Sequence, residues 1–87
     1  MQMRSTMIGE IKMHDVVALL QDVRTKHFES GQALPLRRGQ IGTIVMTYND
    51  GACEAEFADR DGRAFAILPL RPDQLMVLHE TPDFAAA

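Results

Sequence analysis

The chain has 87 residues, of which 46% are hydrophobic and 24% charged, so we expect one globular domain with a modest core. Its net charge of −3 argues against nucleic acid as a partner, because nucleic-acid-binding proteins rely on a general attraction to phosphate. A single cysteine excludes an intrachain disulfide, and without a long apolar run or a leader we expect a cytoplasmic protein that crosses no membrane.

The first part of the chain gives mixed signals. Residues 1–12 show no periodic pattern, so we expect an N-terminal arm before a domain at 13–78. In "HDVVALLQDV", residues 14–23, the apolar positions fit one face of a helix, and they also fit a strand buried on both faces. Residues 24–36 contain a glycine and a proline and predict a long loop.

From Gln40 onward the pattern is typical of β-structure. "QIGTIVMTY" is rich in β-branched residues, and Asp50-Gly51 predicts a hairpin turn before the alternating strand "ACEAEFA". A second turn at 59–62 leads into "RAFAILPL", in which Phe65 and Ile67 share a face. The proline-led turn "RPDQ" then precedes a last short strand at 75–78. We expect residues 79–87 to form a flexible C-terminal tail.

Two glycines mark the start of the β-rich region. Gly39 and Gly42 are followed by Thr43 and a strand, without the lysine and helix of a phosphate-binding loop. We therefore interpret Gly39 as the end of the loop and Gly42 as a site where the strand bends or another strand approaches closely.

The order Arg38-Gly39-x-x-Gly42-x-Ile44, a hairpin and then Glu54-x-Glu56-Phe57 resembles the SH3-like barrels of ribosomal KOW segments and of the nitrile hydratase β-subunit. The resemblance implies that residues 15–17 open the first strand, which favours the strand at 14–23, and that "RPDQL" is a 3₁₀ turn. The predicted fold is mainly β: a small SH3-like barrel of about five short antiparallel strands, with a long first loop.

Residues 13–78 also resemble a small bacterial family of uncharacterised domains, through "DVVALL", "RGQ-GTIV", "Y-DG---EF-D-DGR" and "L---QL--L". The long first loop with Phe28 departs from that pattern. The resemblance implies a small protein that partners another small protein, as in toxin–antitoxin pairs, and it identifies no particular activity.

The sequence offers no catalytic or metal-binding constellation, so we expect no enzyme and no cofactor. Cys53 lies among small apolar positions and is interpreted as buried. The three histidines, His14, His27 and His79, lack the close spacing of metal motifs and are interpreted as surface residues.

The favoured hypothesis is a protein-binding module that self-associates, binds a companion protein, or both. Adding a partner strand to an open edge of the barrel is the expected mechanism, and the acidic residues favour a basic partner. The alternative is a KOW-like contact with RNA or DNA through Arg37 and Arg38, helped by Arg60 and Arg63. The predicted partner-binding residues are Phe28, Arg37, Arg38, Glu54, Glu56, Asp59 and Asp61.

Overall fold

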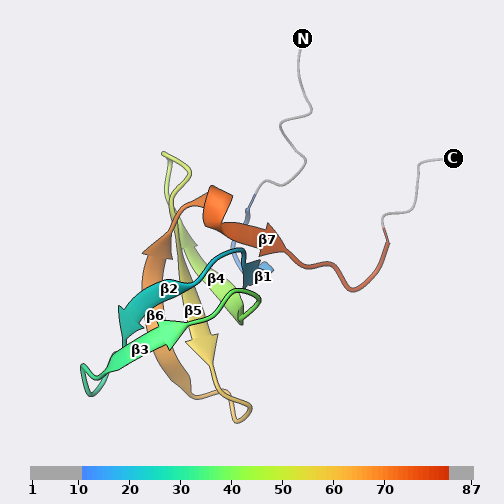
Figure 1. Cartoon of the computed structure of the whole chain (residues 1–87). Coiled ribbons are helices and arrows are strands. Elements are labelled where there is room, and N and C mark those ends of the chain that lie inside the picture. The colour runs from blue at the N-terminus through green and yellow to red at the C-terminus, as the bar shows by residue number, and fades with distance from the viewer. Residues whose placement is uncertain (1–10, 83–87) are drawn as a thin grey trace, which may run out of the picture.

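The computed structural model describes residues 11–82, which form seven strands and one short 3₁₀ helix (Figure 1). The elements are β1 (Val16–Leu19), β2 (Val23–Lys26), β3 (Ala33–Leu36), β4 (Ile41–Thr47), β5 (Cys53–Ala58), β6 (Ala64–Leu70), η2 (Pro72–Gln74) and β7 (Leu75–Val77). Five strands form one antiparallel sheet in the order β6-β5-β4-β1-β7, and β2 pairs with β3 in a second sheet. The prediction of a mainly β fold is confirmed.

The ambiguous segment at 14–23 contains a strand, so the helical alternative is wrong. Val17 and Leu19 of β1 are buried in the core and point to the same side of the sheet. The backbone amide of Leu20 donates to the carbonyl of Gln74, and the chain then bends before β2 begins at Val23. The segment therefore contains β1 and the start of β2.

Residues 24–36 were predicted to be a long loop, and this prediction is wrong. They lie in a β-hairpin, in which Arg24 pairs with Pro35 and Lys26 with Ala33. The inward residues Val23, Leu34 and Leu36 pack against the core, which compensates for the weak strand propensity of this charged and proline-containing segment. Proline is tolerated because β3 pairs with β2 only and needs no second row of hydrogen bonds.

The remaining strands form a meander joined by the turns that the sequence predicts. Gly51 has a φ of 92°, and the Tyr48 and Ala52 backbones close the β4–β5 turn with a hydrogen bond of 2.9 Å. A bulge in β4 between Ile44 and Met46 shifts the register against β5. The predicted 3₁₀ turn is η2, where the side chain of Gln74 accepts a 2.8 Å hydrogen bond from the Arg71 backbone.

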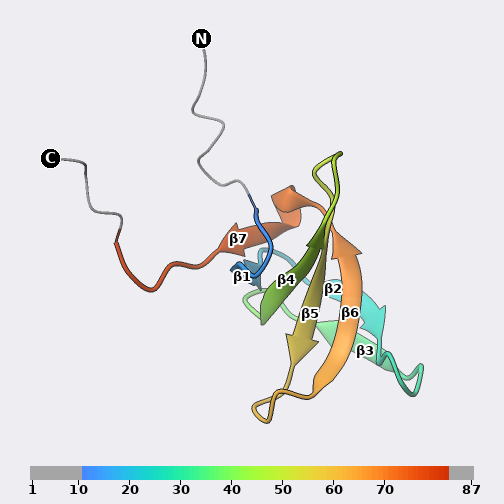
Figure 2. The same ribbon diagram turned by 180° about the vertical axis from the view of Figure 1, so that it is seen from behind.

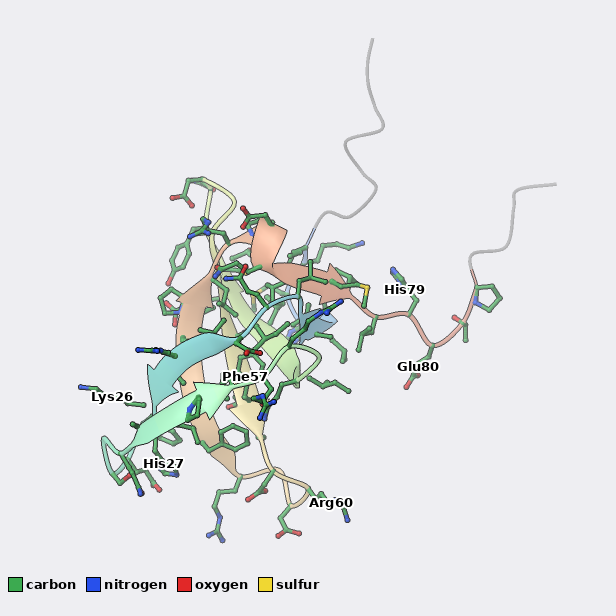
Figure 3. The ribbon with its side chains drawn as sticks, viewed as in Figure 1. Lys26, His27, Phe57, Arg60, His79 and Glu80 are labelled. Carbon is green, nitrogen blue, oxygen red and sulfur yellow. The ribbon has the colours of Figure 1, made fainter. Side chains whose placement is uncertain are left out.

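The core lies between the five-stranded sheet and the hairpin, which crosses the inner side of the sheet (Figures 1 and 2). Phe57 is its largest buried side chain (Figure 3). The fully buried large side chains are Phe57, Leu19, Leu36, Ile44, Val17 and Cys53. A methyl group on Gly42 would lie 2.7 Å from the Phe57 ring, which confirms that this glycine permits a close approach. Gly39, in contrast, has a φ of 90° and turns the chain into β4.

The two sheets meet at the hairpin tip, where the Phe28 amide donates to the Phe65 carbonyl at 3.1 Å. This contact gives the domain a small barrel-like form. Two of the strands with a free side carry proline, Pro35 in β3 and Pro69 in β6. Of the predicted arm and tail, residues 1–10 and 83–87 lie outside the described residues, and 79–82 contain neither helix nor strand. None of the helical segments within 11–82 is long and apolar enough to cross a membrane.

Candidate functional site

The five-stranded sheet has one side that the hairpin does not cover, and we call this side the outer face. Residues that pair across antiparallel strands point to the same side of the sheet. One row runs Val16–Thr43–Glu56–Ile67, and two further rows run Met76–Ala18–Ile41 and Met46–Glu54–Pro69. The outer face is made of Val16, Ala18, Ile41, Thr43, Met46, Glu54, Glu56, Ile67, Pro69 and Met76.

Large apolar side chains of the outer face are exposed. Ile41 is 58% exposed, Met76 49% and Met46 45%. Val16 and Ile67 are each 43% exposed and lie in the same row on opposite sides of Thr43 and Glu56. A surface with this many exposed apolar side chains, here interrupted by Thr43 and Glu56, is typical of a protein-interaction site, whereas single exposed apolar residues are ordinary.

The predicted acidic pair lies within this apolar surface. Glu54 and Glu56 are half-buried on β5, and their cross-strand neighbours are all uncharged. The Tyr48 hydroxyl donates a short hydrogen bond to the Glu54 carboxylate. This bond, with smaller contributions from desolvation and from the negative charge of Glu54, raises the pKa of Tyr48 above 10.0. Among the described residues neither glutamate forms an ion pair.

The other two predicted acidic residues lie in the β5–β6 turn, away from the outer face. One Asp59 carboxylate oxygen accepts hydrogen bonds from the amides of Asp61 and Arg63, at 2.9 and 3.0 Å. Asp59 therefore holds the turn together, and both Asp59 and Asp61 are exposed. The predicted acidic surface is thus divided, with Glu54 and Glu56 on the sheet and Asp59 and Asp61 beyond its end.

The remaining predicted residues lie at the two ends of the β2–β3 hairpin. Phe28 is 51% exposed at the tip and stacks on His27, with ring centroids 5.9 Å apart. Arg37 and Arg38 lie at the other end, where the Arg38 amide donates to the Asp22 carboxylate at 2.8 Å. The structure therefore does not bring Phe28 and the two arginines together into one site.

The β2–β3 hairpin also carries two exposed cations that were not predicted from the sequence. Arg24 and Lys26 are exposed and alternate with the half-buried Val23 and Thr25, so they share the side of the hairpin that faces away from the core. The period-two alternation in "VRTK" was the available signal. It was overlooked because the segment was interpreted as a loop.

The single cysteine and one of the histidines form local hydrogen bonds in the described part of the chain. Cys53 is buried, its thiol donates to the Leu70 carbonyl at 3.4 Å, and burial raises its pKa. His27 uses Nδ1 to accept hydrogen bonds from the amides of Glu29 and Ser30. Between residues 11 and 82 no three His, Cys, Asp or Glu side chains are grouped so that they could hold a metal ion.

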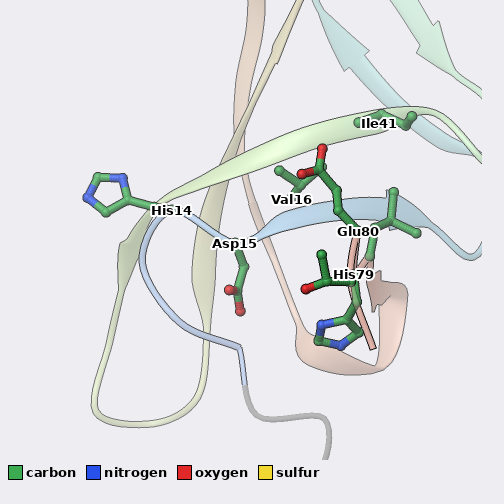
Figure 4. A pocket seen from close by; sticks show the side chains of 8 residues that line it. His14, Asp15, Val16, Ile41, His79 and Glu80 are labelled. Atoms are coloured by element: carbon green, nitrogen blue, oxygen red, sulfur yellow. The ribbon is translucent and has the colours of Figure 1, made fainter. Parts of the chain in front are cut away.

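A groove of about 570 Å³ lies between the beginning of β1, β4 and the segment that follows β7 (Figure 4). Val16, Ile41 and Leu78 provide its apolar surface, so the groove is continuous with one corner of the outer face. His79 and Glu80 contribute its polar groups from the chain after β7, and His14 and Asp15 contribute theirs from the chain before β1. The groove therefore extends the outer face at this corner.

Comparison with known proteins gives one match. A family model described as "Domain of unknown function (DUF4926)" matches residues 13–77, a range that contains all seven strands. No curated protein and no solved structure matches the chain. This match confirms the resemblance of residues 13–78 to a family of uncharacterised domains.

Proposed function

The chain belongs to the DUF4926 family of domains of unknown function, and from its geometry we propose that it is a non-catalytic protein-binding domain. The observation that carries this proposal is the outer face. It joins exposed apolar side chains on β1, β4, β6 and β7 around the half-buried Glu54 and Glu56. A partner that covers this face gains apolar burial, and its cations can satisfy the two carboxylates.

The partner is expected to bind the face of the sheet, in place of the edge addition that the sequence suggested. Pro35 and Pro69 lack an amide hydrogen, which weakens β3 and β6 as templates for an added strand. The strand β7, at the other edge of the sheet, has only three residues. The outer face extends over all five strands and offers the larger surface.

The chemistry of the face favours a partner with apolar and basic side chains. A second copy of the chain fits this description, and so does a companion protein, which gives the domain an antitoxin-like role. We also propose that the barrel is SH3-like, because its meander and the 3₁₀ turn η2 before the last strand follow that pattern.

The test is an affinity capture from lysate of the native host with the tagged full-length chain, with and without nuclease treatment. The double variant Glu54→Lys/Glu56→Lys is compared with Glu29→Lys/Asp61→Lys, which changes the charge equally at exposed positions outside the outer face. We expect a stoichiometric protein to survive nuclease and to be lost only with the first variant. Equal capture by wild type and both folded variants would overturn the proposal.

A second candidate is nucleic-acid binding, favoured by one observation. The hairpin carries Arg24 and Lys26 on its outward side and Arg37 and Arg38 at its end. Fluorescence anisotropy with a labelled single-stranded RNA tests it: binding should weaken steeply with salt and fall in Arg37→Ala/Arg38→Ala. Binding that is absent at low salt would eliminate this candidate.

A further inference from the structure

The proposed protein-binding role rests on the outer face, and the charges of the chain identify one partner for it. We propose that the β2–β3 hairpin of one copy docks on the outer face of a second copy, so that the chain associates head to tail. This inference rests on the proposed function and specifies its partner.

The docking element is the side of the hairpin that faces away from the core, which we call the hairpin surface. It consists of Arg24, Lys26, Ala33 and Pro35, which pair across the two strands. All four residues are exposed, and neither cation forms an ion pair among residues 11–82. Figure 3 shows Lys26 pointing away from the domain. The hairpin surface therefore combines two free cations with two small apolar side chains.

The two surfaces match in the spacing of their charges. Arg24 and Lys26 are two positions apart on β2, and Glu54 and Glu56 are two positions apart on β5. Side chains at positions i and i+2 of a strand lie on the same side, about 6.5–7 Å apart along it. Two ion pairs can therefore form at once when β2 of one copy lies along β5 of the next.

The apolar residues match as well. Ala33 and Pro35 lie beside the two cations on the hairpin, and Met46 and Ile67 lie beside the two glutamates on the outer face. Docking would cover Met46 and Ile67, which are 45% and 43% exposed. Burial of apolar area would hold the copies together, and the ion pairs would set the register.

A two-fold arrangement of the outer faces is disfavoured, because it would bring Glu54 and Glu56 of two copies toward each other. An intramolecular contact is excluded by the fold. The inward residues Val23, Leu34 and Leu36 pack on the inner side of the sheet, so the hairpin surface and the outer face lie on opposite sides of the molecule. Each copy can thus bind one neighbour on each side, which produces chains or closed rings.

The test is sedimentation equilibrium of two purified variants of the full chain, alone and mixed. Glu54→Lys/Glu56→Lys retains the hairpin surface, and Arg24→Glu/Lys26→Glu retains the outer face. Wild type should form dimers and larger species that dissociate with added salt, and each variant alone should associate at least tenfold more weakly. An equimolar mixture should regain association, because the unaltered hairpin surface of one variant fits the unaltered outer face of the other, and the two reversed surfaces are also complementary in charge.

Two control variants test whether the effect is specific to the charges of the two surfaces. Tyr48→Phe removes the hydrogen bond to Glu54 and keeps both carboxylates, so its self-association should equal that of wild type. Arg60→Glu/Arg63→Glu repeats the charge change of the hairpin variant in the exposed β5–β6 turn and should also leave self-association unchanged. If Glu54→Lys/Glu56→Lys does not fold, Glu54→Gln/Glu56→Gln takes its place, with a smaller weakening expected because it removes the attraction without adding repulsion.

Wild type that remains monomeric at all concentrations would overturn the inference, and so would a mixture that forms no complex. The inference would also be overturned if wild type does not self-associate but binds a labelled single-stranded DNA, and if Arg24→Glu/Lys26→Glu abolishes that binding. The hairpin would then be assigned to nucleic-acid binding. A monomeric chain that still captures a lysate protein through Glu54 and Glu56 would leave the proposed function standing, so the two failures are distinguishable.

Discussion

The contact between Gly42 and Phe57 gives a prediction whose size follows from the structure. In Gly42→Ala the new Cβ would lie 2.7 and 2.9 Å from two carbons of the Phe57 ring and 3.0 Å from the Glu56 carbonyl oxygen. Because carbon atoms prefer about 3.5–4.0 Å, the ring would have to move by roughly 0.8 Å or more. Phe57 is fully buried, so we expect a loss of about 1–3 kcal/mol in the free energy of unfolding.

The assay is urea unfolding followed by circular dichroism, with thermal melts in parallel. For a domain of this size Tm should fall by about 4–8 °C for each kcal/mol lost. The double variant Gly42→Ala/Phe57→Leu should lose less than the sum of the two single variants, because the smaller side chain relieves the clash. Wild-type stability of Gly42→Ala, or strict additivity in the double variant, would refute the steric argument.

Gly31 provides a matched control. An added Cβ there meets no atom within 4 Å, but its φ is +73°. Gly31→Ala should be destabilised through its backbone alone, by about 1–2 kcal/mol, and Gly31→Asn should recover much of that loss. The loss in the free energy of unfolding caused by Gly31→Ala should be the same with and without Phe57→Leu.

Three further predictions concern single side chains. Absorbance titration of Tyr48, the only tyrosine of the chain, should give a pKa above 10.0, and this pKa should fall toward 10.0 in Glu54→Ala. Because folding raises the pKa of Tyr48, its hydrogen bond to Glu54 stabilises the fold fully below pH 10. This contribution is lost as the pH rises through the folded-state pKa. Identical titrations of the two proteins would contradict the hydrogen bond. Cys53 in the native protein should react with an aromatic disulfide reagent roughly 10³-fold or more slowly than in denaturant, and immediate reaction would contradict its burial. Asp59→Ala should lose about 1–2 kcal/mol in urea unfolding through two turn hydrogen bonds, whereas Asp61→Ala should change little; equal losses would contradict this role.

The β-meander could be predicted from sequence because its signals are local. Asp50-Gly51 specifies a turn by backbone conformation, and the alternation around Cys53 and Phe57 specifies which side of β5 is buried. The β2–β3 hairpin had only a short local signal, the alternation in "VRTK", which does not specify its pairing or its packing. Its strands are stabilised by packing of Leu34 and Leu36 on residues far away in the sequence, and no local pattern reports such contacts.

The candidate site was predicted in part. Glu54 and Glu56 were identified from strict alternation, but the apolar residues around them were not. Val16 was assigned to a strand buried on both sides, although the fold covers only one side of the sheet and leaves Val16 43% exposed. The topology of the fold determines which side of a sheet is covered by a second layer. Here the β2–β3 hairpin covers the inner side and leaves the outer face exposed.

The pairing of β1 with β7 has a consequence for the order in which the protein folds. Val17 pairs with Val77, so this contact closes a loop of sixty residues, whereas the turns of the meander close loops of only a few. The larger loop costs roughly 2 kcal/mol more in chain entropy. The contacts of largest sequence separation therefore join the first and last strands, and we expect these strands to pair after the meander has formed. The last contact to form in folding is expected to be the first to open, at the edge of the sheet where β7 lies.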